Sequence, residues 1–253
     1  MDWTDEGIVL AARRHGESSA VVQLLTREHG RHAGLARGGS ASRGRGVYQP
    51  GNLLSAHWRA RLAEHLGSYS CELSRSYSAL LLDDPQRLAG LSSACAMAEA
   101  ALPERHPYPK LYAGLVVLLE ALVSSPAWAE VYARWELGLL EELGFGLDLS
   151  ACAATGATEE LIYVSPKSGR AVSRRAGEPY RDKLLPLPGF LVNREGGRED
   201  GDILAALKLT GSFLDRYVFA PHDRRLPHAR GRFIDRLSRS PSISSGIRGN
   251  DDA

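Results

Sequence analysis

The chain has few cysteines and no long apolar run. Only three of its 253 residues are cysteines, namely Cys71, Cys95 and Cys152, and no two of them form a CxxC pair. This pattern excludes a disulfide framework and a four-cysteine zinc site. The longest apolar run, residues 111–123, has about 13 residues and includes Glu120, so it is too short to cross a bilayer. Because the first seven residues, MDWTDEG, lack a basic region, we expect a cytoplasmic protein without a secretory signal.

The sequence motifs of common catalytic sites are also absent. There is no GxxxxGK[ST] phosphate loop, no GxGxxG, no HExxH and no GxSxG. His222 and Asp223 are adjacent, and neighbouring side chains on an extended segment point apart, which disfavours a catalytic triad. A nuclease would need clustered carboxylates for Mg²⁺. The only acidic residues in 8–62 are Glu17 and Glu28. We therefore expect a binding protein without a cofactor rather than an enzyme.

Arginine, by contrast, is concentrated near the N-terminus. The whole chain has a formal charge of +1, but residues 8–62 carry a surplus of seven positive charges, which come from nine arginines without any lysine. The guanidinium group offers a planar fork for phosphate and a face that stacks on bases, so we expect an anionic partner. Solvated surface arginines are the alternative. The candidate binding residues are Arg13, Arg14, Arg27, Arg31, Arg37, Arg43, Arg45, Arg59 and Arg61.

The same region has the pattern of five short strands. We expect them near residues 7–14, 20–27, 31–37, 53–62 and 68–75, with glycine-containing turns between them. In the fourth strand, alternation places Trp58 and Leu62 on the inner face and Arg59 and Arg61 in solvent. Five such strands suit a small closed barrel.

Residues 37–46 interrupt this pattern with glycine, serine and arginine. The composition is typical of an irregular interstrand loop, and three arginines would let it lie along a phosphate backbone. Aromatic residues that could stack on bases are sparse here. Since Trp58 is expected in the core, Tyr48 is the best stacking candidate.

After residue 83 the apolar period changes to that of helices. Asp84 is a candidate N-cap with Pro85 at the first helical position. Apolar stripes predict helices that end before Pro103, Pro126, Gly144 and Pro221, and we expect these stripes to form a helical core. Between the third and fourth helices, residues 161–164 and 170–173 form an expected hairpin. The tail from Ser238 is of low complexity and expected to be disordered.

Several segments in order resemble the RecO family of bacterial recombination mediators. The likeness covers nearly the whole chain except the tail. Its segments are Gly7–Leu10, Arg14–Glu17, Val22–Gly30, Gly34–Gly38, Tyr48–Asn52, Leu143–Phe145, Leu147–Ser150, Cys152 and Tyr163–Pro166.

The resemblance implies an α+β multidomain fold. An N-terminal five-stranded OB-fold barrel, residues 1–78, would bind single-stranded DNA. A mainly α-helical domain would comprise residues 79–149 and 197–237, with an insertion at 150–196 and a disordered tail at 238–253.

In some family members the insertion binds zinc through four cysteines. Here Cys152 matches the first ligand position, but Thr155, Ser173 and Ala176 stand near the others, and none of these is a suitable ligand. We therefore expect a zinc-finger-like insertion without its zinc ligands, and no bound metal.

The resemblance also implies a role in DNA repair and recombination through the RecFOR pathway. The protein would bind single-stranded DNA, and double-stranded DNA weakly, and anneal complementary strands. With RecR it would help to load RecA onto DNA coated with single-strand-binding protein, in the cytoplasm at the nucleoid and without a membrane. The acidic, apolar C-terminal tail of single-strand-binding protein would need a basic-rimmed apolar pocket, for which Arg105, Lys110 and Arg134 are rim candidates. The alternative is an OB-fold RNA-binding module without mediator activity.

Overall fold

A computed structural model describes residues 1–192 and 201–239, without the side chain of Arg43. The chain divides into two compact units. One comprises residues 1–128 with 227–230, and the other comprises residues 129–226 with the chain from 231 onward. None of the described helices is long and apolar enough to cross a membrane.

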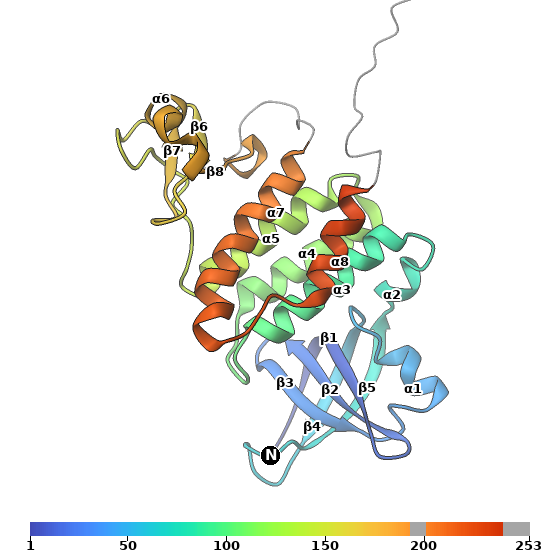
Figure 1. Cartoon of the computed structure of the whole chain (residues 1–253). Coiled ribbons are helices and arrows are strands. Elements are labelled where there is room, and N and C mark those ends of the chain that lie inside the picture. The colour runs from blue at the N-terminus through green and yellow to red at the C-terminus, as the bar shows by residue number, and fades with distance from the viewer. Residues whose placement is uncertain (193–200, 240–253) are drawn as a thin grey trace, which may run out of the picture. The chain divides into compact units, whose positions relative to one another are not determined.

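The N-terminal strands form a closed barrel in the order β1-β2-β3-β5-β4 (Figure 1). All neighbouring strands are antiparallel except β3 and β5, which close the barrel through a short parallel pair. This confirms the expected five-stranded OB-like barrel. The strands are β1 (Asp2–His15), β2 (Ser19–Thr26), β3 (Gly30–Ala36), β4 (Leu53–Arg59) and β5 (Ser68–Arg75).

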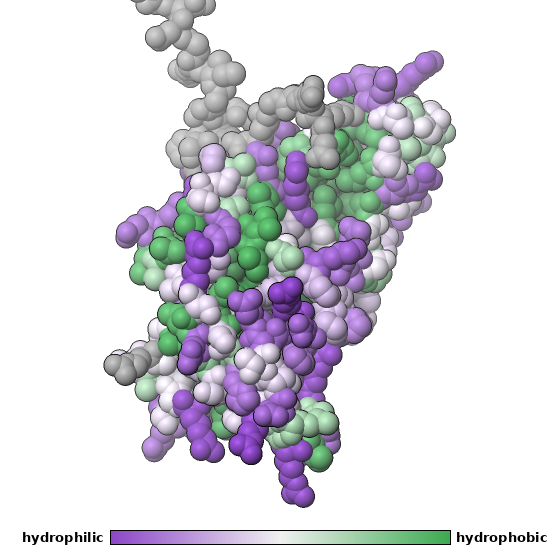
Figure 2. All heavy atoms as spheres, turned by 180° about the vertical axis from the view of Figure 1, so that it is seen from behind, coloured by the Kyte–Doolittle hydropathy of each residue, from purple (hydrophilic) through white to green (hydrophobic). Residues whose placement is uncertain are grey.

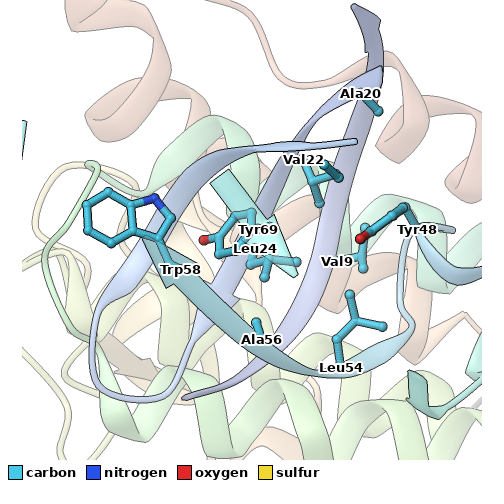
Figure 3. Packing of buried hydrophobic residues seen from close by; sticks show 10 residues of the cluster. Val9, Ala20, Val22, Leu24, Tyr48, Leu54, Ala56, Trp58 and Tyr69 are labelled. Atoms are coloured by element: carbon cyan, nitrogen blue, oxygen red, sulfur yellow. The ribbon is translucent and has the colours of Figure 1, made fainter. Parts of the chain in front are cut away.

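Alternating apolar side chains fill the barrel (Figure 3), with Trp58 and Tyr48 at opposite ends of the cluster. Trp58 is 2% exposed, whereas Arg59 and Arg61 lie in solvent, which confirms the alternation expected for β4. The expectation for Leu62 is wrong: β4 ends at Arg59, so Leu62 lies in the following loop and is 46% exposed. Tyr48 is buried in the core, so it is not available as a stacking surface.

The glycine- and arginine-rich stretch is more regular than its composition predicts. Residues Ser42–Val47 form a short helix, α1. A Cβ atom on Gly44 would lie 2.2 Å from the carbonyl oxygen of Gly38, so glycine is needed where α1 crosses the preceding turn. Asn52 fixes the end of α1 because its Nδ2 donates to the carbonyl oxygens of Gly46 and Val47.

Three helices follow the barrel in the first unit: α2 (Tyr77–Leu80), α3 (Pro85–Ala101) and α4 (Pro109–Ser124). Asp84 caps α3 as predicted, and its carboxylate accepts hydrogen bonds from the backbone N–H groups of Gln86 and Arg87. Helix α3 packs against β1, β2 and α4, so it fixes one side of the barrel.

The second unit contains most of the remaining helices and the insertion. The predicted third helix is present as α5 (Trp128–Glu142), and the fourth as α7 (Asp202–Phe213), continued by a π-helical turn, η3 (Leu214–Phe219). A further helix, α8 (His228–Ser238), was not predicted. Of the expected disordered tail, residues 240–253 lie outside the described part of the chain.

The insertion contains the predicted hairpin, β6 (Leu161–Val164) and β7 (Ala171–Ser173). A two-residue strand, β8 (Leu185–Pro186), extends it to three strands in the order β7-β6-β8. Short helical turns complete the segment. They are α6 (Arg174–Gly177), η1 (Glu178–Lys183) and η2 (Gly189–Val192), while η4 (Ala220–His222) follows η3.

Candidate nucleic-acid interface

The nine candidate arginines divide between the two ends of the barrel. Strand register places the end of β1, the start of β2 and the end of β3 together, since Arg14 faces Ala20 and Ala20 faces Ala36. This end, the α1 end, holds Arg13, Arg14, Arg37, Arg43 and Arg45. The start of β1 pairs with the end of β4, and the β2–β3 turn lies at the same level. This second end, the β2–β3 end, holds Arg27, Arg31, Arg59 and Arg61. The two ends are not fully separate, because Ser68 on β5 pairs with Arg59 of β4 and with Leu35 near the end of β3.

Three of the nine arginines already have protein partners. The guanidinium of Arg13 lies 2.5 Å from the carboxylate of Glu99. Arg14 donates to the carbonyl oxygens of Gly16 and Glu17 in its own turn. Arg31 donates from Nε to the carbonyl oxygen of Leu102 at 2.8 Å, and its side chain is only 16% exposed. Arg31 therefore stabilises the first unit rather than offering its charge to a ligand.

Five others are exposed and form no ion pair with a described residue. Two belong to the α1 end and three to the β2–β3 end, so the exposed arginines are not confined to one end of the barrel. These five are Arg27, Arg37, Arg45, Arg59 and Arg61.

Loop contacts hold the α1 end in shape. Ser40 N donates to the carbonyl oxygen of Ser18 at 2.9 Å, and its hydroxyl donates to that of Glu17. The segment that carries Arg37 and Arg45 is therefore fastened to the β1–β2 turn.

The β2–β3 end contains an aromatic cluster that the sequence analysis missed. Its members are Trp3, His29, His32, Trp58 and Tyr69. Trp3 precedes the segment in which the sequence predicts the first strand, and His29 falls in a predicted turn. No local sequence signal shows that these two rings meet.

His32 is the buried titratable member of this cluster. Burial, aided by the nearby positive charge of Arg105, lowers the pKa of His32 from 6.5 to about 4. Its Nδ1 lies 2.9 Å from the carbonyl oxygen of Ala33 and 3.3 Å from the Tyr69 hydroxyl. Burial likewise raises the pKa of Tyr69 above its ordinary value. His32 and Tyr69 are thus both uncharged at neutral pH.

The insertion does not provide a set of zinc ligands around Cys152. The Cys152 sulfur accepts a hydrogen bond from the backbone N–H of Ser173 at 3.3 Å. Burial opposes ionisation, but hydrogen bonds from Ser173 and Thr155 lower the pKa of Cys152 to about 6. Among the described residues, no three His, Cys, Asp or Glu side chains are grouped as metal ligands. Where the family's zinc site would need thiolates, Thr155 and Ser173 offer hydroxyl groups and Ala176 a methyl group, so the residues present do not fit zinc.

The three rim candidates have different environments. Arg105 donates to the carbonyl oxygens of Glu64 and His65, and Arg134 donates to that of Phe190. Lys110 is exposed in the first turn of α4. Val117, seven residues later and 58% exposed, lies on the same face of α4. Figure 2 shows apolar surface interspersed with hydrophilic surface on one face of the molecule.

Comparison with known proteins identifies the family. The model of the recombination protein O N-terminal domain matches residues 1–77, and that of its C-terminal domain matches residues 82–226. The chain is 56% identical to a DNA repair protein RecO of Rhodospirillum centenum, with 98% of each chain covered. It is 50% identical to the protein of that name in Phenylobacterium zucineum, over 94% of this chain and 98% of the relative. It is 52% identical to the DNA repair protein RecO of Ruegeria sp., over 94% of this chain and 99% of the relative. The chain belongs to the RecO family of DNA repair proteins.

Proposed function

We propose that this protein is a noncatalytic recombination mediator. Residues 1–78 bind single-stranded DNA, and double-stranded DNA weakly. The protein anneals complementary strands and, with RecR, helps RecA to load onto DNA coated with single-strand-binding protein. This activity belongs at the nucleoid, in the cytoplasm. The observation that carries the proposal is the set of five exposed barrel arginines without ion pairs, in a chain whose relatives are named DNA repair proteins.

The mechanism is electrostatic. Each arginine that contacts a phosphate releases condensed counterions, which favours binding. Neutralising two strands also lowers their mutual repulsion, so base pairing nucleates without nucleotide hydrolysis. Of the nine candidate arginines we expect roughly four to six to contact phosphates, and the five exposed ones are the first choice.

The tail of single-strand-binding protein would dock on the exposed face of α4. Lys110 offers a positive charge and Val117 an apolar side chain on that face, which suits an acidic, apolar peptide. Leu80 and Leu82 are 56% and 66% exposed, and α2 packs on α4. Lys110→Glu should weaken binding of a tail peptide without changing affinity for naked single-stranded DNA. Equal peptide affinity for the variant and the unaltered protein would place the tail elsewhere.

The decisive experiment is annealing of two complementary strands coated with single-strand-binding protein, without nucleotide, at two salt concentrations. We expect rapid annealing that salt slows. The double variant Arg37→Ala with Arg45→Ala should lose most of this activity. Arg175→Ala is the matched control, because it removes an exposed arginine from the insertion.

Each failure has a separate meaning. Annealing of naked but not coated strands would leave a basic DNA binder without the partner contact. Failure on both kinds of strand, together with tighter binding to RNA, would favour the RNA-binding alternative.

A further inference from the structure

Three aromatic rings at the β2–β3 end of the barrel lie nearly parallel. The His29 imidazole lies on the Trp3 indole with a centroid separation of 4.1 Å and an interplanar angle of 8°. Trp3 in turn lies against Trp58 at 5.6 Å and 19°. His32 meets both indoles edge-on, at 5.1 Å and 4.8 Å. The three rings therefore form an ordered stack, and His32 packs edge-on against the two indoles.

The stack leads from the core of the barrel to solvent. Trp58 is 2% exposed and belongs to the barrel core, while Trp3 is partly buried. The side chain of His29 is 32% exposed. A side chain that served only to close the core would gain by burying its ring completely. Here the outermost ring keeps part of its surface in water.

Hydrogen bonds fix the orientation of the outermost ring. The Nδ1 atom of His29 lies 3.0 Å from a carboxylate oxygen of Asp5, whose side chain is 6% exposed. The same oxygen accepts the backbone N–H of Glu28 at 2.8 Å, and the backbone N–H of His29 donates to Thr26 Oγ1. A ligand that stacks on this ring therefore meets a preformed surface and has little side-chain entropy to offset.

We propose that the exposed side of His29 is a stacking platform for one unpaired nucleobase, which would continue the ring stack of Trp58, Trp3 and His29. This inference rests on the proposed binding of single-stranded DNA and names a site where a base, rather than a phosphate, is held. Stacking accepts any base because every base has a π face.

Charges around the platform suit a strand that passes over it. Arg27 is exposed two residues before His29. Arg59, also exposed, follows Trp58 directly and pairs in register with Asp2. Asp2 and Glu28 are exposed at the same end and would repel phosphate. The platform itself therefore favours the neutral base, and the two arginines offer contacts for the flanking phosphates.

The stacking geometry has a consequence for annealing. A base held by one face keeps its pairing edge free, whereas a base read by hydrogen bonds at that edge cannot pair. The platform can thus orient a base and still leave it available to the complementary strand.

The test compares two oligonucleotides of equal length and charge: oligo(dT) and the same backbone with abasic residues. We expect the unaltered protein to bind oligo(dT) more tightly by about fivefold to a hundredfold, the range for one stacked base. His29→Ala should lose this preference while binding the abasic strand as before, and His29→Phe should restore part of it. His222→Ala removes an exposed histidine outside the barrel and serves as the control.

Equal affinity of the unaltered protein for both strands would overturn the platform while leaving single-stranded DNA binding intact. This comparison needs no variant, so a folding defect cannot obscure it. The platform would also be overturned if His29→Ala lowered the affinity for oligo(dT) and for the abasic strand equally, with unchanged thermal unfolding. If the unaltered protein binds neither strand, the proposed function fails together with the platform.

Discussion

Arg13 on strand β1 and Glu99 on helix α3 form an ion pair with 2.5 Å between guanidinium nitrogen and carboxylate oxygen. The Glu99 side chain is 20% exposed and that of Arg13 is 71% exposed. The pair joins the α1 end of the barrel to the helix that packs on it. It also means that an arginine can be exposed and still have its charge largely compensated.

Arg13 should therefore contribute less to DNA binding than its exposure indicates. We expect Arg13→Ala to change the slope of log affinity against log salt by less than Arg37→Ala or Arg45→Ala, each of which should reduce it by about 0.7. The measurement is a salt titration of oligonucleotide binding. Glu99→Gln frees Arg13 and should raise affinity slightly; a fall would show that the pair positions the surface.

The stability of the barrel should fall in mildly acidic solution because of His32. Its pKa is about 4 in the folded state against 6.5 for the free side chain, so the unfolded chain takes up a proton that the folded chain does not. Stability is therefore complete well above pH 6.5 and decreases as the pH falls toward 4, by roughly 3 kcal/mol.

Urea unfolding at several pH values measures this effect. His32→Gln should flatten the pH dependence in that window even where it lowers absolute stability, since the slope reports proton uptake alone. His15→Gln replaces an exposed histidine on β1 and should keep the original slope. An unchanged slope in His32→Gln would assign the acid sensitivity to other groups.

Gly30 should be among the glycines least tolerant of substitution. It has a φ of +66°, and an added Cβ would lie 1.9 Å from the carbonyl oxygen of His106. We expect Gly30→Ala to destabilise the protein by about 2–4 kcal/mol, through backbone strain and the clash together. Gly16 has a φ of +64° but open space around it, so Gly16→Ala should cost only about 1 kcal/mol. Equal costs in thermal unfolding would show that the contact with residue 106 relaxes easily.

The insertion should keep its stability without metal. We expect a chelator to leave the melting temperature unchanged and metal analysis to find far less than one zinc per chain, because Cys152 is the sole thiol among its described residues. Cys152→Ala removes the acceptor for the Ser173 N–H and should destabilise the second unit by about 1 kcal/mol. A stoichiometric metal, or a large loss on chelation, would contradict this account.

Local sequence signals predicted much of the fold. The side chain of Asp84 and the fixed φ of Pro85 act within one turn, so the start of α3 could be read directly from the sequence. The alternation around Trp58 predicted the correct inner face of β4, because alternation depends only on neighbouring residues in the strand. Helix α8 was missed because residues 228–238 are rich in charge and carry few apolar positions. Helix α1 was missed because two of its six residues are glycine, which ordinarily disfavours a helix.

The functional assignment of single residues depends on contacts that sequence does not specify. The sequence does not distinguish Arg31 from the other arginines of residues 8–62, but its Nε donates to the carbonyl oxygen of Leu102, which is distant in the chain. Trp3 and His29 meet because two strand pairings bring their ends together. Composition could show that the barrel is cationic, but only the ion pairs and hydrogen bonds of the folded chain show which arginines already have partners.

The link between the barrel and residues 102–106 has a consequence for cooperativity. Arg105 N donates to the carbonyl oxygen of Arg31, so this segment adds a bridge to the edge of β3. A fragment that ends at residue 78 would lose this bridge and leave the Arg31 guanidinium without its acceptor. The amide protons of β3 should therefore exchange with solvent at the rate of the helices that follow the barrel, because strand and helices open as a single foldon.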